Sequence, residues 1–71
     1  MTFAEWNSTV FREMQGLGYE VSYKCRLPFI RTPSTPEGKV KLLEIRLSVP
    51  VDRKIYADGV FLVPPGVRWE P

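Results

Sequence analysis

The stretch YEVSYKCRLPF, residues Tyr19 to Phe29, alternates apolar and polar side chains with little interruption. Because every second side chain of a strand points to the same face, the pattern predicts a strand with one buried and one exposed face. A second stretch, Lys41 to Val51, repeats the alternation, with apolar side chains at Leu43, Ile45, Leu47, Val49 and Val51. We therefore expect strands over about residues 19–31 and 39–51, paired as a hairpin across a proline-containing loop.

An amphipathic helix is predicted over about residues 3–16. Thr2 and Glu5 have the spacing of a capping box, and Gly16 and Gly18 favour a helix end. Its apolar stripe consists of Phe3, Trp6, Val10, Met14 and Leu17. Asn7 is a polar residue that lies beside this apolar stripe. The stripe is the part of the chain suited to cover the apolar face of the sheet.

Val60 to Val63 predicts a third strand, followed by an irregular tail over residues 64–71 in which Trp69 folds back onto the rim of the core. Pro28 lacks an amide donor and places the first strand at an edge, so the second strand is central. The chain is thus expected to form a single α+β domain, residues 1–71, with one N-terminal helix packed on one face of a three-stranded antiparallel meander sheet. In an alternative, Lys54 to Tyr56 forms a short hairpin with Val60 to Val63.

Composition narrows the class of protein. With 71 residues, 44% hydrophobic and 25% charged, the chain is long enough for one small globular domain and no more. Ten basic and eight acidic residues are interspersed, which is weak support for a nucleic-acid partner. The longest apolar run is far shorter than the roughly 18 residues of a membrane helix. A lone cysteine and no recognisable signal peptide favour a cytoplasmic protein that does not span a membrane.

The sequence contains few residues suited to catalysis or metal binding. The chain has no histidine, its carboxylates are scattered, and one cysteine cannot build a thiolate zinc site. Cys25 shares the parity of the apolar face, which indicates a buried side chain rather than a nucleophile. We expect no enzyme activity, no cofactor and no metal.

The hairpin register predicts an apolar cluster on the outward face of the sheet, formed by Pro28, Ile30, Val40 and Leu42. Basic residues would surround it at Arg26, Arg31, Lys39 and Lys41. Two interpretations remain open. The loop or the Trp69 tail covers the cluster, or the cluster is exposed and binds another protein, with a homodimer through the edge strand as a further possibility.

The function expected from these features is that of a small non-enzymatic protein-binding module. Such a module would act as a modulator or inhibitor that occludes a surface of a larger protein, of the kind that phages and mobile elements encode. The alternative is a nucleic-acid-binding protein that uses a basic row on the outer face of the sheet, formed by Lys24, Arg26 and Arg46.

Overall fold

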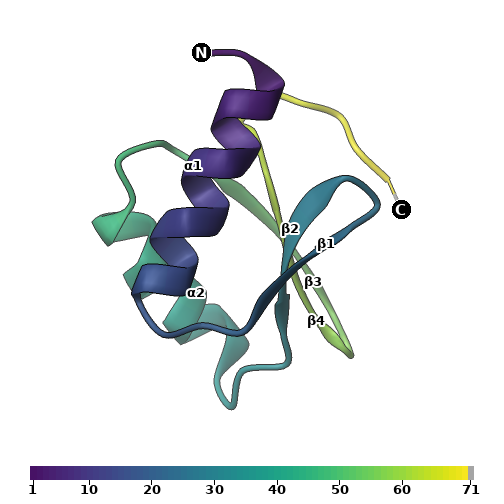
Figure 1. The fold of residues 1–71 in the computed structure, drawn as a ribbon. Helices are drawn as coiled ribbons and strands as arrows, with labels where there is room; N and C mark the ends of the chain where they lie inside the picture. Colours follow the sequence, from purple (N-terminus) through teal and green to yellow (C-terminus); the bar gives the residue numbers. More distant parts are fainter. Residues whose placement is uncertain (71) are drawn as a thin grey trace.

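The computed structural model describes residues 1–70 and contains two helices and four strands (Figure 1). In chain order the elements are α1 (Phe3–Gly16), β1 (Val21–Lys24), β2 (Leu27–Arg31), α2 (Pro36–Arg46), β3 (Asp52–Tyr56) and β4 (Gly59–Val63). The α+β class and the N-terminal helix are confirmed. The predicted single helix and three-stranded meander are wrong, because the chain has a second helix and a fourth strand.

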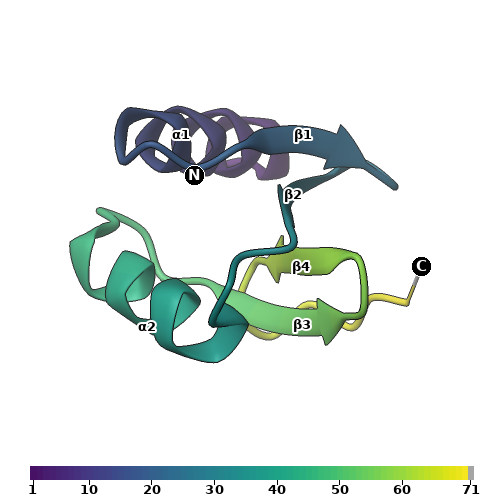
Figure 2. The same ribbon diagram turned by 90° about the horizontal axis from the view of Figure 1, so that it is seen from below.

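The four strands form one antiparallel sheet in the order β1-β2-β4-β3, so β2 and β4 are central. Both helices lie on the same side of this sheet (Figure 2). α1 lies alongside the β1–β2 half, and α2 lies alongside the β3–β4 half. The helix layer therefore has an inner side that covers the sheet and an outer side that faces away from it.

α1 follows the sequence prediction closely. The Thr2 hydroxyl accepts from the Glu5 amide at 3.2 Å, and the Glu5 carboxylate accepts from the Thr2 amide at 3.3 Å, which completes the capping box. Trp6, Val10 and Met14 form the buried stripe, whereas Phe3 and Leu17 of the predicted stripe are exposed. The helix ends where Gly18 takes a φ of +91°, a conformation that glycine adopts without strain.

The predicted strand 19–31 is two strands, because the chain reverses at Cys25 and Arg26. Both residues have positive φ, 53° and 68°, as a two-residue type I′ turn requires. Asn7, the exception in the helix stripe, is buried and donates its amide Nδ2 to the Arg26 carbonyl at 3.0 Å, which fastens the turn to α1. Cys25 is exposed at this turn, so its predicted burial is wrong.

The predicted strand 39–51 is also wrong, since most of it belongs to α2. Val40, Leu43 and Leu47 are spaced i, i+3 and i+7 and face the core, which is the spacing of a helix rather than of a strand. Pro36 occupies the first turn, where its missing amide donor costs nothing. After Leu47 an irregular loop leads to β3, and α1 holds this loop: Trp6 Nε1 donates to the Pro50 carbonyl at 3.1 Å.

The alternative hairpin near the C-terminus is confirmed as β3 and β4, paired from Asp52 with Val63 to Tyr56 with Gly59. Pro28 does not mark an edge strand, because β2 lies between β1 and β4. The ladder between β2 and β4 begins at Phe29, one residue later, so the missing amide of Pro28 costs no hydrogen bond to β4.

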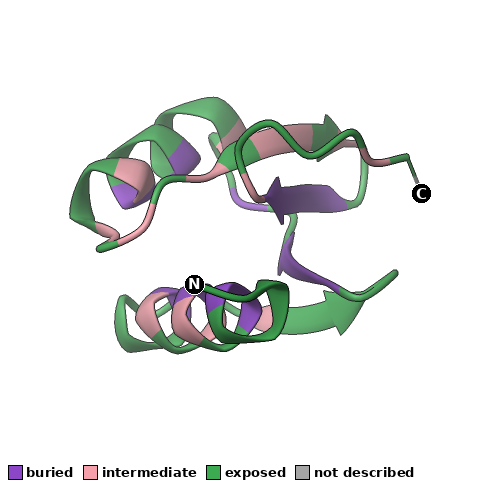
Figure 3. Ribbon diagram, turned by 90° about the horizontal axis from the view of Figure 1, so that it is seen from above, coloured by how far each residue is buried: buried purple, intermediate pink, exposed green. Residues whose placement is uncertain are grey.

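Burial is concentrated in β2 and β4, as Figure 3 shows. On the side without helices, Phe61 packs against Phe29, Tyr56 and Trp69, with ring centroids 4.7, 5.5 and 4.6 Å apart. The predicted return of Trp69 onto the core rim is therefore confirmed. Residues 64–70 of the tail contain no helix or strand, and Pro71 lies outside the described residues. The tail shields the centre of the helix-free face.

Candidate interaction surface

The apolar cluster predicted from the hairpin register does not form. Ile30 is 1% exposed and Val40 is fully buried, and Pro28 is buried as well. The reason is that β2 is a central strand and α2 turns Val40 toward the sheet. Of the four predicted apolar residues, only Leu42 reaches solvent, at 59% exposure.

The predicted basic residues are distributed over several elements. Arg26 lies in the β1–β2 turn, Arg31 ends β2 at 3.7 Å from Glu20, and Lys39 belongs to α2. The row of Lys24, Arg26 and Arg46 is not brought together either. Arg46 lies in the last turn of α2, on the opposite side of the molecule from the β1–β2 turn (Figure 1).

Lys24 is engaged within the fold. Its ammonium group lies 2.8 Å from the Asp58 carboxylate and 4.8 Å from the centre of the Phe29 ring. The hydrogen bond from Lys24 holds the pKa of the Asp58 carboxyl below its ordinary value. This contact joins β1 to the β3–β4 turn, so the Lys24 side chain already forms an ion pair within the protein.

The sequence prediction missed the outer side of α2. Gly38, Lys41, Leu42 and Ile45 are all exposed and, at about 100° per residue, share this side; we call them the α2 outer surface. Ile45 is 76% exposed, more than most other large apolar side chains of the fold. α2 therefore carries apolar residues on both of its sides, whereas a helix at a protein surface usually carries them on one.

A shallow groove extends the α2 outer surface toward α1. It encloses about 120 Å³ and is lined by Leu17, Tyr19, Leu42, Leu43 and Arg46. Leu17 is 39% exposed where α1 ends, and the Tyr19 hydroxyl donates to the Lys39 carbonyl at 3.0 Å, which ties this segment to α2. The apolar surface thus spans both helices.

The charges around this surface are mainly positive. Lys39, Lys41 and Arg46 are exposed, and no carboxylate within residues 1–70 lies at ion-pair distance from them. Glu44, on the flank nearer β3, is only partly exposed and lies 3.2 Å from Arg53. Apart from Glu44, the carboxylate residue of α2 is Glu37.

Within the described part of the chain, no group of three or more histidine, cysteine, aspartate or glutamate residues is arranged to hold a metal ion. None of the helices seen in residues 1–70 has the length and apolar character needed to cross a membrane. Comparison with protein-family models, with curated proteins and with solved structures gave no match.

Proposed function

We propose that the protein is a small non-enzymatic protein-binding module whose binding site is the α2 outer surface. The observation that carries this proposal is the exposure of Leu42 and Ile45, at 59% and 76%, on the outer side of a helix that already buries another apolar side. Covering two such side chains would contribute about 25 cal/mol for each Å² removed from water. Exposed apolar residues with a charged border are typical of protein-binding surfaces.

In this proposal the module acts as a modulator or inhibitor, because a small folded domain can occlude a surface of a larger protein without chemistry of its own. The same proposal includes that the protein is one of the compact proteins that phages or mobile elements encode. It also places the protein in the cytoplasm, where the exposed Cys25 would stay reduced.

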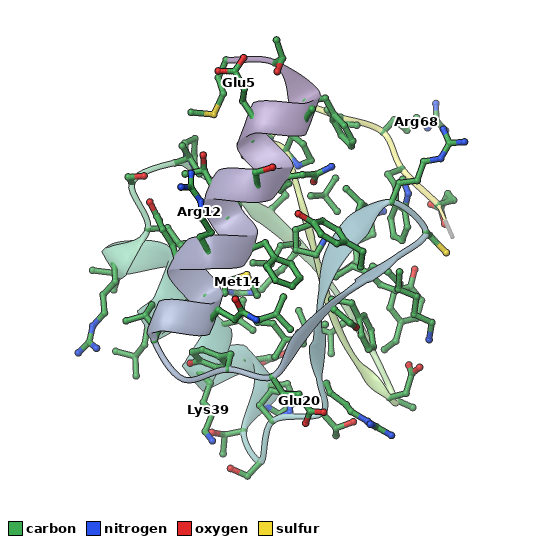
Figure 4. The ribbon with its side chains drawn as sticks, viewed as in Figure 1. Glu5, Arg12, Met14, Glu20, Lys39 and Arg68 are labelled. Carbon is green, nitrogen blue, oxygen red and sulfur yellow. The ribbon has the colours of Figure 1, made fainter. Side chains whose placement is uncertain are left out.

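Nucleic-acid binding is the weaker candidate, because its affinity depends on several cations that contact phosphates together. Lys24 already pairs with Asp58. Lys39 and Arg68 lie at opposite ends of the molecule (Figure 4), so these two cations do not contact neighbouring phosphates together. The helix-free face, where aromatic side chains could stack on bases, is occupied by the packing of Trp69 on Phe61.

The proposal is tested by site-specific photo-crosslinking in the cells that naturally make the protein. Ile45→p-benzoylphenylalanine places the probe on the α2 outer surface, and Ser22→p-benzoylphenylalanine places it on exposed β1 as a matched control. We expect a discrete covalent adduct with one protein from position 45, lost when Leu42→Ser is added, and none from position 22. An adduct from position 22 alone would contradict the proposed site.

A further inference from the structure

The α2 outer surface has the shape of a helix-packing ridge. Gly38, Leu42 and Ile45 are spaced i, i+4 and i+7, so they follow one line along the helix. A Cβ atom at Gly38 would meet no atom within 4 Å, so the position is open toward solvent. Because Gly38 has no side chain, a second helix would be able to approach closely at this end of the ridge, and Leu42 and Ile45 would fill the grooves between its side chains further along.

Cations border this ridge on both sides. At about 100° per residue Lys41 falls on one flank, and Lys39 and Arg46 fall on the other, where Arg46 also lines the groove beside Leu17. Glu44 is engaged by Arg53, which leaves Glu37 near the N-terminus of the helix as the counter-charge. A partner that fits this surface therefore presents an apolar stripe bordered by carboxylates.

We infer that the α2 outer surface binds an acidic amphipathic helix of another protein, an inference that rests on the proposed function. The partner helix would place apolar side chains at i, i+3 or i+4, and i+7 against Leu42 and Ile45, with Asp or Glu beside Lys41 and Arg46. Charge complementarity of this kind speeds association and selects among partners.

Two other occupants fit the observations less well. A second copy of the chain would bring Lys39, Lys41 and Arg46 of each copy together, with Glu37 as the carboxylate left to offset them. An anionic bilayer usually requires a broad apolar face with large aromatic side chains. The exposed apolar side chains of α2 are the two aliphatic residues Leu42 and Ile45.

The experiment is a selection from a displayed library of random 16-residue peptides on the intact protein. Peptides that also bind the Leu42→Ser/Ile45→Ser variant are removed. We expect the enriched sequences to share apolar residues at helical spacing and an excess of Asp and Glu. A synthetic representative should gain helical circular dichroism on binding and should bind Lys41→Glu/Arg46→Glu at least about tenfold more weakly. Its affinity should fall as salt rises from about 50 mM to about 500 mM.

The control variant is Arg68→Glu/Arg26→Glu, which reverses two exposed charges outside α2 and should leave peptide affinity within about twofold. Thermal melts establish that each variant is folded. Enriched peptides that are basic or extended, or no enrichment at all, would overturn the inference. So would dimerisation lost in Ile45→Ser, or binding of phosphatidylserine vesicles that competes with the peptide. If any of these results is found but position 45 still crosslinks to one protein, the inferred helical partner is wrong and the proposed function stands. If position 45 gives no crosslinked adduct, the proposed function itself is refuted.

Discussion

Leu42 and Leu43 are neighbours of the same residue type, and α2 places them in opposite environments. Leu43 is 1% exposed and belongs to the core, whereas Leu42 is 59% exposed on the α2 outer surface. Replacing each by alanine removes the same atoms. The pair therefore measures how the helix is oriented on the sheet, with propensity and chemistry held constant.

The expected difference follows from burial. Leucine to alanine removes three carbon atoms, worth about 2.5 kcal/mol at about 0.8 kcal/mol for each buried methylene. At the fully buried Leu43 a cavity adds to this loss, so Leu43→Ala should destabilise by about 3 to 5 kcal/mol. Leu42 has only about two-fifths of its surface covered, so Leu42→Ala should cost about 1 kcal/mol or less.

Urea denaturation followed by tryptophan fluorescence measures both values, since Trp6 and Trp69 contact the core. If Leu43→Ala is too unstable to fold, the isosteric change Leu43→Met provides a folded variant whose loss should stay below about 1.5 kcal/mol. Equal losses for the two alanine variants would refute the assigned orientation of α2.

Gly59→Ala should unfold the protein, because the added Cβ would collide with the Ile30 carbonyl in the neighbouring central strand. Far-UV circular dichroism measures this loss of structure. Arg26→Gly should stabilise the protein by about 0.5 kcal/mol in urea denaturation, because the relief of strain at a φ of +68° exceeds the added freedom of glycine in the unfolded chain. A loss of stability would contradict the positive φ at this position. The pKa of Asp58 is lowered in the folded state, so the ion pair with Lys24 stabilises the fold at neutral pH. That contribution is lost as pH falls from about 3.8, the ordinary pKa of an aspartate carboxyl, through the lower folded pKa. Carboxyl NMR titration should show the pKa of Asp58 rising toward its ordinary value in Lys24→Met, and an unchanged pKa would contradict the assigned cause.

The elements predicted correctly from sequence are those in which local signals agree with tertiary packing. α1 has its capping box at Thr2 and Glu5, an apolar stripe of period 3.6 and a glycine where the helix ends. β4 contains the short apolar run from Val60 to Val63, which follows a glycine and precedes Pro64. In both, composition, spacing and termination indicate the same structure.

The remaining errors arose where two periodicities coincide or where a turn lacks its usual residues. Leu43, Ile45 and Leu47 alternate as in a strand, yet Val40, Leu43 and Leu47 also satisfy helical spacing, and packing against the sheet selects the second. The turn at Cys25 and Arg26 contains neither glycine nor asparagine. It depends on Asn7, nineteen positions from Arg26 in sequence, and no local pattern reports such a contact.

The predicted apolar cluster is wrong because it requires a strand over residues 39–51. Such a strand would place Val40 and Leu42 on one outward face with Ile30, whereas the structure buries Ile30. The signal that could have identified the α2 outer surface is the run from Pro36 to Arg46, with proline at its start and apolar residues on both sides of a helical wheel. Leu42 is the residue common to the predicted cluster and the observed surface.

The most direct test of the central claim is to measure affinity and stability together for Leu42→Ser/Ile45→Ser, using the protein captured by crosslinking at position 45. Both side chains lie on the α2 outer surface and outside the core. The free energy of unfolding should therefore stay within about 1 kcal/mol of the wild-type value, while affinity by calorimetry should fall at least about tenfold. A folded double variant that binds this partner with unchanged affinity would contradict the claim that the α2 outer surface is the binding site.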